Sequence, residues 1–236
     1  MQSDKSTPVL ITGADTITGY NTARAIRDLD VGIWGLTSDI TSKECTSVYW
    51  DRLIKIEPTA QNVLDVLILT GQEYQSGHDA KNKIILLISQ DYVVRAVSSQ
   101  RNELSKYYHF VLPEHDIVER LLDKTKFHEW AYEAGHSVPG TFMVKDEAEL
   151  ESVLSTIKYP AILKPSERSD LWDYKNSSIK GIRLNCETDL KPYRQDLFKW
   201  APDYIIQEWV PGDDEQVYFC LFYFDSNGNE LSFQLL

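Results

Sequence analysis

Residues Asp203 to Tyr223 read DYIIQEWVPGDDEQVYFCLFY, and they decide how the second half of the chain folds. A short apolar strand at 204–206 runs on through Val210, turns at a Pro-Gly pair and passes three acids at 213–215 before another β-prone run. Such a crossover places the backbone carbonyl of Glu208 and the amide of Val210 on an open edge, where they could clamp a purine. An ordinary hairpin with an acidic loop explains the same residues, so the choice depends on the rest of the chain.

Length and composition are those of a globular protein. A chain of 236 residues can form one large or two small domains, and 42% hydrophobic with 25% charged residues is typical of soluble globular proteins. The net charge of −12 argues against a nucleic-acid partner, because phosphate binding needs concentrated Lys and Arg. No apolar run approaches the roughly 20 residues of a membrane-spanning helix, and the N-terminus lacks a signal-peptide core. We therefore expect a cytoplasmic protein without a membrane partner.

Searches for familiar catalytic and metal-binding patterns find nothing. The sequence has no GxxxxGK[ST], HExxH or GxSxG motif. Its three cysteines, Cys45, Cys186 and Cys220, are scattered and lack the paired spacing of a zinc site or a disulfide framework. We expect the cysteines to be reduced and structural, and neither a catalytic residue nor a metal ligand follows from these patterns.

The first half of the chain predicts a parallel sheet. A strand at 8–12, a glycine loop at 13–19, a helix at 20–29 and a strand at 31–36 form a βαβ unit. The glycine spacing does not match GxGxxG, so a bound dinucleotide is only an alternative here. Further alternation predicts a doubly wound domain that ends near Pro113, with strands at 52–56, 83–88 and 109–112 and helices at 60–69 and 90–106.

The sequence of the second half predicts an α+β unit, unlike the doubly wound first half. Asp123 is a plausible helix N-cap, and Gly135 is a plausible C-terminal stop. The remaining expected elements are helices at 114–122, 147–157 and 188–200, strands at 161–165 and 180–184, the strand that begins at 204, and a hairpin turn at 225–228.

Two lysines in this half could bind an anion. Lys124 lies in the first turn of a predicted helix, where unpaired amides and the helix dipole favour negative charge, and Lys164 ends a strand beside a polar loop. Taken singly, each is explained as a solvated surface residue. Together with the purine clamp at 208–210 and acids that can hold ribose hydroxyls, they form the ordered set that a nucleoside triphosphate needs.

At this point the chain resembles the ATP-grasp ligases over nearly all its length. VLITGADTITGYNTARAI (9–26) is similar to their pre-grasp domain, and LLDKTKFHEWAYEAGHSVPGTFMV (121–144) is similar to the start of the grasp fold. YPAILKP (159–165) resembles the strand of the second phosphate-binding lysine, and IIQEWVPGDDEQVYF (205–219) resembles the adenine hinge. The pattern is closest to carboxylate-amine ligases of the D-aspartate ligase type.

The resemblance implies a fold and a set of site residues. The fold is α/β, with a Rossmann-like pre-ATP-grasp domain at 1–113 and the first α+β subdomain of the ATP-grasp fold at 114–236. The family often has glutamate where this chain has Gln207, which can still accept a hydrogen bond through its amide oxygen. The implied nucleotide-binding residues are Lys124 and Lys164 for phosphate, Gln207, Glu208, Trp209 and Val210 at the hinge, and Asp214 or Glu215 for the ribose.

The resemblance also implies what this chain lacks. Relatives carry their Mg²⁺ ligands on the second half of the grasp fold, and this chain stops at Leu236, so we expect a truncated chain that is inactive alone. The implied function is the ATP-binding part of a carboxylate-amine ligase that works through an acylphosphate, with ATP and Mg²⁺ as cofactors and a small-molecule carboxylate and amine as substrates. The alternatives are an NAD(P)-binding Rossmann oxidoreductase or epimerase and a non-catalytic nucleotide-binding module.

Overall fold

The chain folds into two compact units, residues 1–122 and 123–236. The structure, a computed structural model, describes residues 7–79, 81–166, 172, 175, 180–225 and 227–235. Helix α5 (His115–Leu122) lies in the first unit, where the Arg95 guanidinium pairs with Glu119 at 2.8 Å. The domain limits of 1–113 and 114–236 stay a prediction from the sequence.

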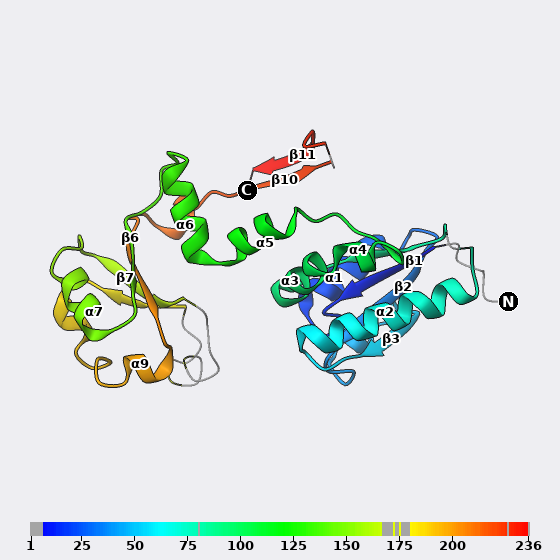
Figure 1. The fold of residues 1–236 in the computed structure, drawn as a ribbon, viewed down its shortest axis with the longest axis horizontal. Coiled ribbons are helices and arrows are strands. Elements are labelled where there is room, and N and C mark those ends of the chain that lie inside the picture. Colours follow the sequence, from blue (N-terminus) through cyan, green and yellow to red (C-terminus); the bar gives the residue numbers. More distant parts are fainter. Residues whose placement is uncertain are drawn as a thin grey trace. The chain divides into compact units, whose positions relative to one another are not determined.

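A five-stranded parallel sheet forms the centre of the first unit (Figure 1), in the order β3-β2-β1-β4-β5. Side chains alternate along its central strand, so Leu10 enters one hydrophobic core while Val9 and Ile11 enter another. Both faces of the sheet are thus buried, as in a doubly wound domain. The strands are β1 (Pro8–Thr12), β2 (Gly32–Thr37), β3 (Arg52–Lys55), β4 (Ile84–Leu87) and β5 (Tyr108–His109).

Helices and one 3₁₀ turn connect these strands. The first helix begins at Ile17 and not at Tyr20 as predicted, because the Thr16 side chain accepts a hydrogen bond from the Gly19 amide and caps it. The predicted helix at 90–106 is interrupted at Gln100, where φ is −114° and ψ is 28°. The elements are α1 (Ile17–Ile26), η1 (Glu44–Thr46), α2 (Ala60–Ser76), α3 (Asp91–Ser99), α4 (Arg101–Leu104) and α5.

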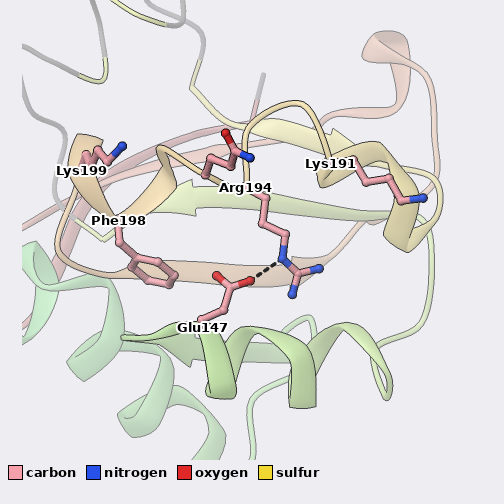
Figure 2. A pocket seen from close by; sticks show the side chains of 6 residues that line it. Glu147, Lys191, Arg194, Phe198 and Lys199 are labelled. Atoms are coloured by element: carbon pink, nitrogen blue, oxygen red, sulfur yellow. Dashed lines mark hydrogen bonds and ion pairs between the residues drawn. The ribbon is translucent and has the colours of Figure 1, made fainter.

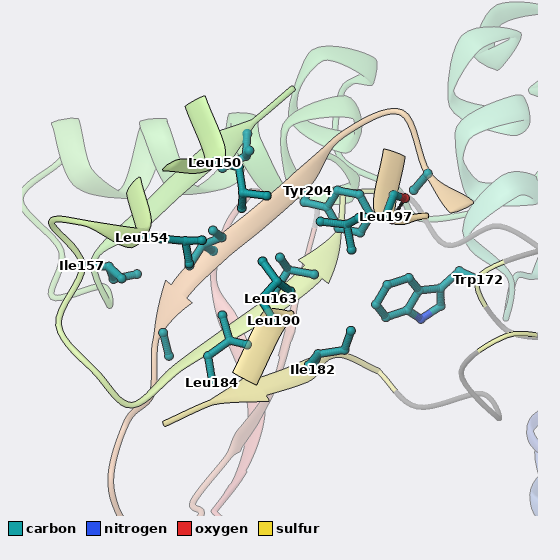
Figure 3. Packing of buried hydrophobic residues seen from close by; sticks show 14 residues of the cluster. Leu150, Leu154, Ile157, Leu163, Trp172, Ile182, Leu184, Leu190, Leu197 and Tyr204 are labelled. Carbon is teal, nitrogen blue, oxygen red and sulfur yellow. Dashed lines mark hydrogen bonds between the residues drawn. The ribbon is translucent and has the colours of Figure 1, made fainter. Parts of the chain in front are cut away.

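An antiparallel sheet of four strands, in the order β6-β9-β7-β8, organises the second unit. One face of this sheet carries a hydrophobic core (Figure 3), in which the Trp172 ring lies 5.8 Å from that of Tyr204. The strands are β6 (Thr141–Val144), β7 (Ala161–Pro165), β8 (Ile182–Leu184) and β9 (Tyr204–Glu208), and the helices are α6 (Lys124–Glu133), α7 (Glu147–Leu154), η2 (Glu187–Leu190) and α9 (Leu197–Trp200).

The chain then continues into a separate two-stranded sheet. After the 3₁₀ turn η3 (Asp214–Gln216), strands β10 (Cys220–Phe224) and β11 (Glu230–Leu235) pair antiparallel around the predicted turn, in which the Asp225 carboxylate accepts from the Asn227 and Asn229 amides. Among the described residues of the whole chain, no helix is both long enough and apolar enough to cross a bilayer.

Candidate functional site

The face of the four-stranded sheet opposite its core carries two of the candidate residues. Along β9, Tyr204 and Ile206 point into the core, so alternation places Gln207 on the other face. The same alternation in β7 places Lys164 on that face, because Leu163 lies in the core. Strand order therefore brings together Lys164 and Gln207, which lie far apart in the sequence.

Lys124 and Lys164 converge on the end of β7. The Lys164 ammonium donates to the Gln207 side-chain oxygen at 3.1 Å, and the Lys124 ammonium donates to the backbone carbonyl of Ser166 at 2.8 Å. Burial, and then the positive charge of Lys124, lower the pKa of Lys164 below its ordinary value. The two cations repel each other, so an anion bound beside them would relieve the repulsion.

Ser166 is a polar residue of this region that the sequence analysis did not single out. Its hydroxyl oxygen is buried and has no hydrogen-bond partner among the described residues. A hydroxyl that is buried without a partner costs folding free energy. Its position directly after Lys164 and Pro165 was visible in the sequence, but its burial was not.

The main-chain amides of residues 208 and 209 are hydrogen-bonded to the neighbouring segments, and among the described residues that of residue 210 is not. The Glu208 amide donates to the Gly140 carbonyl at 2.8 Å, and the Trp209 amide donates to the Pro160 carbonyl at 3.0 Å. The Val210 amide makes no main-chain hydrogen bond to a described residue, and Val210 is 67% exposed. The proposed clamp thus lies where the ladder ends, and its Val210 donor is available to a ligand.

The side chains of Glu208 and Trp209 are held by neighbours that the sequence did not identify. The Glu208 carboxylate accepts from the Gly140 amide at 3.1 Å, and a Cβ added at Gly140 would lie 2.9 Å from the Glu208 carboxyl carbon. The guanidinium carbon of Arg183 lies 4.5 Å from the Trp209 ring centroid, a cation–π distance. Both side chains are therefore positioned from adjacent segments of the same unit.

The acids expected to hold a ribose remain less defined. Glu215 is exposed in η3, and the side chain of Asp214 lies outside the described residues. The turn before them is fixed by the Asp213 amide, which donates to the Gln216 side chain at 3.0 Å. Among the described contacts none joins Glu215 to Lys124 or Lys164, so a ribose role stays a prediction.

A pocket of about 630 Å³ in the same unit contains none of the candidate residues (Figure 2). Arg194 lies in it, but its guanidinium is paired with both Glu147 and Glu151 of α7, which neutralise its charge. The positive charge of Arg194 is therefore already used within the protein. Its lining residues are Glu147, Lys191, Arg194, Gln195, Phe198 and Lys199.

The described residues do not supply a metal centre. Within the parts of the chain that the structure describes, no three His, Cys, Asp or Glu side chains group together in a way that could hold a metal ion.

Comparison with known proteins confirms the predicted fold, because the parallel sheet followed by the antiparallel sheet matches the N-terminal part of solved ATP-grasp enzymes. No family model matches the chain. The chain is 26% identical over 146 residues to D-aspartate ligase from Enterococcus faecium (strain Aus0004), a match that covers 59% of this chain and 34% of the ligase.

Two solved structures share the fold. An ADP complex of N5-carboxyaminoimidazole ribonucleotide synthetase matches with a TM-score of 0.68 at 16% identity, over 97% of this chain and 52% of that one. The L-amino acid ligase from Bacillus licheniformis matches with a TM-score of 0.65 at 12% identity, over 97% of this chain and 50% of that one. The chain thus spans about half the length of these structures and a smaller share of the D-aspartate ligase.

Proposed function

We propose that this chain is the ATP-binding part of an ATP-dependent carboxylate-amine ligase that works through an acylphosphate intermediate. The observation that carries the proposal is the convergence of Lys124 and Lys164 at the end of β7. The available Val210 amide and the ADP complex of the similar synthetase support an adenine nucleotide as the ligand. A cytoplasmic location fits this proposal.

In the reaction we propose, the γ-phosphoryl group passes from ATP to a substrate carboxylate, and an amine then attacks the acyl carbon and releases phosphate. The two lysines of this chain would bind and orient the phosphates and offset their charge, and the 208–210 main chain would fix the base. When bound, Mg²⁺ would supply further charge neutralisation at the phosphates, through ligands outside the described residues. Because one relative is a D-aspartate ligase, D-aspartate is the first carboxylate to test.

The dinucleotide alternative is less well supported by the first unit. The Asp15 carboxylate lies in the glycine loop and accepts from the Ser38 and Asp39 amides, each at 2.9 Å. Burial is the largest single effect and raises the pKa of Asp15, but the hydrogen bonds from the Ser38 hydroxyl and from these amides together lower it below its ordinary value. A carboxylate held ionised in this loop would repel a dinucleotide pyrophosphate.

Replacement of Lys164 tests the proposal directly. We expect Lys164→Met to weaken ATP and ADP binding by at least about tenfold, because a charge-assisted hydrogen bond contributes roughly 1.5–3 kcal/mol. The matched control is Lys126→Met, which removes an exposed lysine of the same helix as Lys124 and should change the affinity less than about twofold. Isothermal calorimetry of both variants measures the difference, and equal losses would contradict the proposal.

Thermal-shift measurements with four ligands separate the alternatives. A ligand that binds only the folded chain raises its melting temperature, so ATP or ADP should stabilise the wild-type chain. Stabilisation by NAD or NADP alone would favour the Rossmann oxidoreductase. No response to any of the four would contradict an ATP-binding function for this chain.

A further inference from the structure

A hydrogen-bonded chain of side chains crosses three strands of the second unit. The Lys164 ammonium donates to the Gln207 amide oxygen at 3.1 Å, and the Gln207 amide nitrogen donates to the Thr141 hydroxyl at 2.9 Å. The Thr141 hydroxyl then donates to the Pro139 carbonyl at 2.9 Å. We refer to these four residues as the Thr141 relay.

The strand register explains why these side chains meet. Thr141 of β6 is paired with Gln207 of β9, and Gln207 is paired with Ile162 of β7. Paired residues of antiparallel strands share a face, and so do residues two apart on one strand, which brings Lys164 onto the face of Gln207 and Thr141. The relay is thus a diagonal across β6, β9 and β7.

Chemistry fixes the direction of every hydrogen bond in the relay. An ammonium group can only donate, so the Gln207 atom that faces Lys164 must be its oxygen. The amide nitrogen of Gln207 therefore faces Thr141, whose oxygen must accept. Because the Pro139 carbonyl can only accept, the Thr141 hydroxyl hydrogen is directed to it, and its oxygen remains free to accept from Gln207.

We propose that Thr141 is a positioning residue for Lys164 and acts by holding the Gln207 amide in this one orientation. Without the hydroxyl, the Gln207 amide nitrogen loses its partner, and the Lys164 ammonium alone selects the orientation of the amide. The amide oxygen would then hold the ammonium less firmly beside the phosphates. The inference rests on the proposed function, since it takes the phosphates of an adenine nucleotide as the ligand of Lys164.

Thr141→Val tests the relay, because valine keeps the shape and the strand propensity of threonine and replaces the hydroxyl by a methyl group. We expect ATP and ADP to bind about fivefold more weakly, the effect of one neutral hydrogen bond of about 1 kcal/mol. Adenosine, which has no phosphate but would still meet Gln207 at the hinge, should lose less affinity than ATP. Thr141→Ser keeps a hydroxyl at this position and should restore ATP affinity. Calorimetry with ATP, ADP and adenosine measures each constant.

A double-mutant cycle separates positioning from general structural damage. If Thr141 acts through Lys164, then Thr141→Val should have no further effect on ATP affinity in the Lys164→Met background. Additive losses, or an equal loss of adenosine affinity, would overturn the relay while leaving ATP binding in place. A wild-type chain that binds neither adenosine nor ATP would instead overturn the proposed function and the relay together.

Discussion

Lys164 combines a predicted role in binding with a cost to folding. Its pKa is lowered in the folded chain, chiefly by burial and further by Lys124, so the unfolded chain holds this proton more tightly. A lysine of this kind destabilises the fold at pH values below its folded-state pKa. The cost falls as the pH rises from that value toward the ordinary 10.5, because both states then lose the proton.

We therefore expect Lys164→Met to stabilise the chain without ligand at pH 7, by about 2 °C in melting temperature. The gain should shrink as the pH approaches 10.5, and melting curves recorded from pH 7 to pH 10.5 measure it. Lys126→Met, which also removes one positive charge but from an exposed ion pair with Asp123, is the matched control. A gain that is constant across this range would show that packing, and not charge, is responsible.

The sequence could predict those residues of the candidate site that are marked by their own neighbours in the chain. Lys124 follows a helix cap and Lys164 ends a strand, and the structure has both of these elements. Thr141, Arg183 and the burial of Ser166 could not be predicted, because they depend on the order β6-β9-β7-β8. A strand reveals which of its residues share a face, but not which strand lies beside it.

Among the secondary-structure elements, β7 is approached closely by Gly181, the residue directly before β8. A Cβ at this position would lie 2.7 Å from the Leu163 carbonyl oxygen and 2.9 Å from Cγ of Lys164. We expect Gly181→Ala to destabilise the second unit by about 2 kcal/mol, because backbone must move to make room. Chemical denaturation measures this loss, and ATP affinity should fall as well because the Lys164 stem is displaced.

Gly77→Ala is the matched control for Gly181→Ala. Gly77 ends α2 with a φ of −107°, and the nearest atom to an added Cβ is the Tyr74 carbonyl oxygen at 4.0 Å. Stability and ATP affinity should both remain near wild type. Equal losses from the two substitutions would indicate a general cost of replacing glycine, and the close approach of Gly181 to β7 would not explain the result.

One predicted helix shows why apolar spacing alone is not enough to place a helix. The predicted helix at 188–200 is instead the 3₁₀ turn η2 and the short helix α9, with turns between them. The Asp189 carboxylate accepts from the amides of Asn185 and Cys186 and so favours a tight turn at the start. Leu190 and Leu197 still reach the core, which is why the apolar spacing resembled that of one longer helix.

At the scale of the whole molecule, each unit has its own hydrophobic core. Leu67 of α2 is buried in the first unit, and Leu154 of α7 is buried in the second. Leu→Ala at a buried site costs roughly 2–5 kcal/mol, which is a large fraction of the roughly 5–15 kcal/mol by which a domain is stable. Substitution of Leu67 should therefore lower the stability of the first unit, and substitution of Leu154 that of the second.

We expect scanning calorimetry of the chain to resolve two transitions, of which ATP shifts only one. Leu154→Ala should lower the transition that ATP raises, because the candidate site and Leu154 belong to the same unit, and Leu67→Ala should lower the other. ATP at a hundred times its dissociation constant should add about 2.7 kcal/mol to the second unit alone. A single transition that ATP and both substitutions shift alike would contradict independent folding. If ATP raised only the transition that Leu67→Ala lowers, the nucleotide would bind the first unit, and the paired lysines would not be its site.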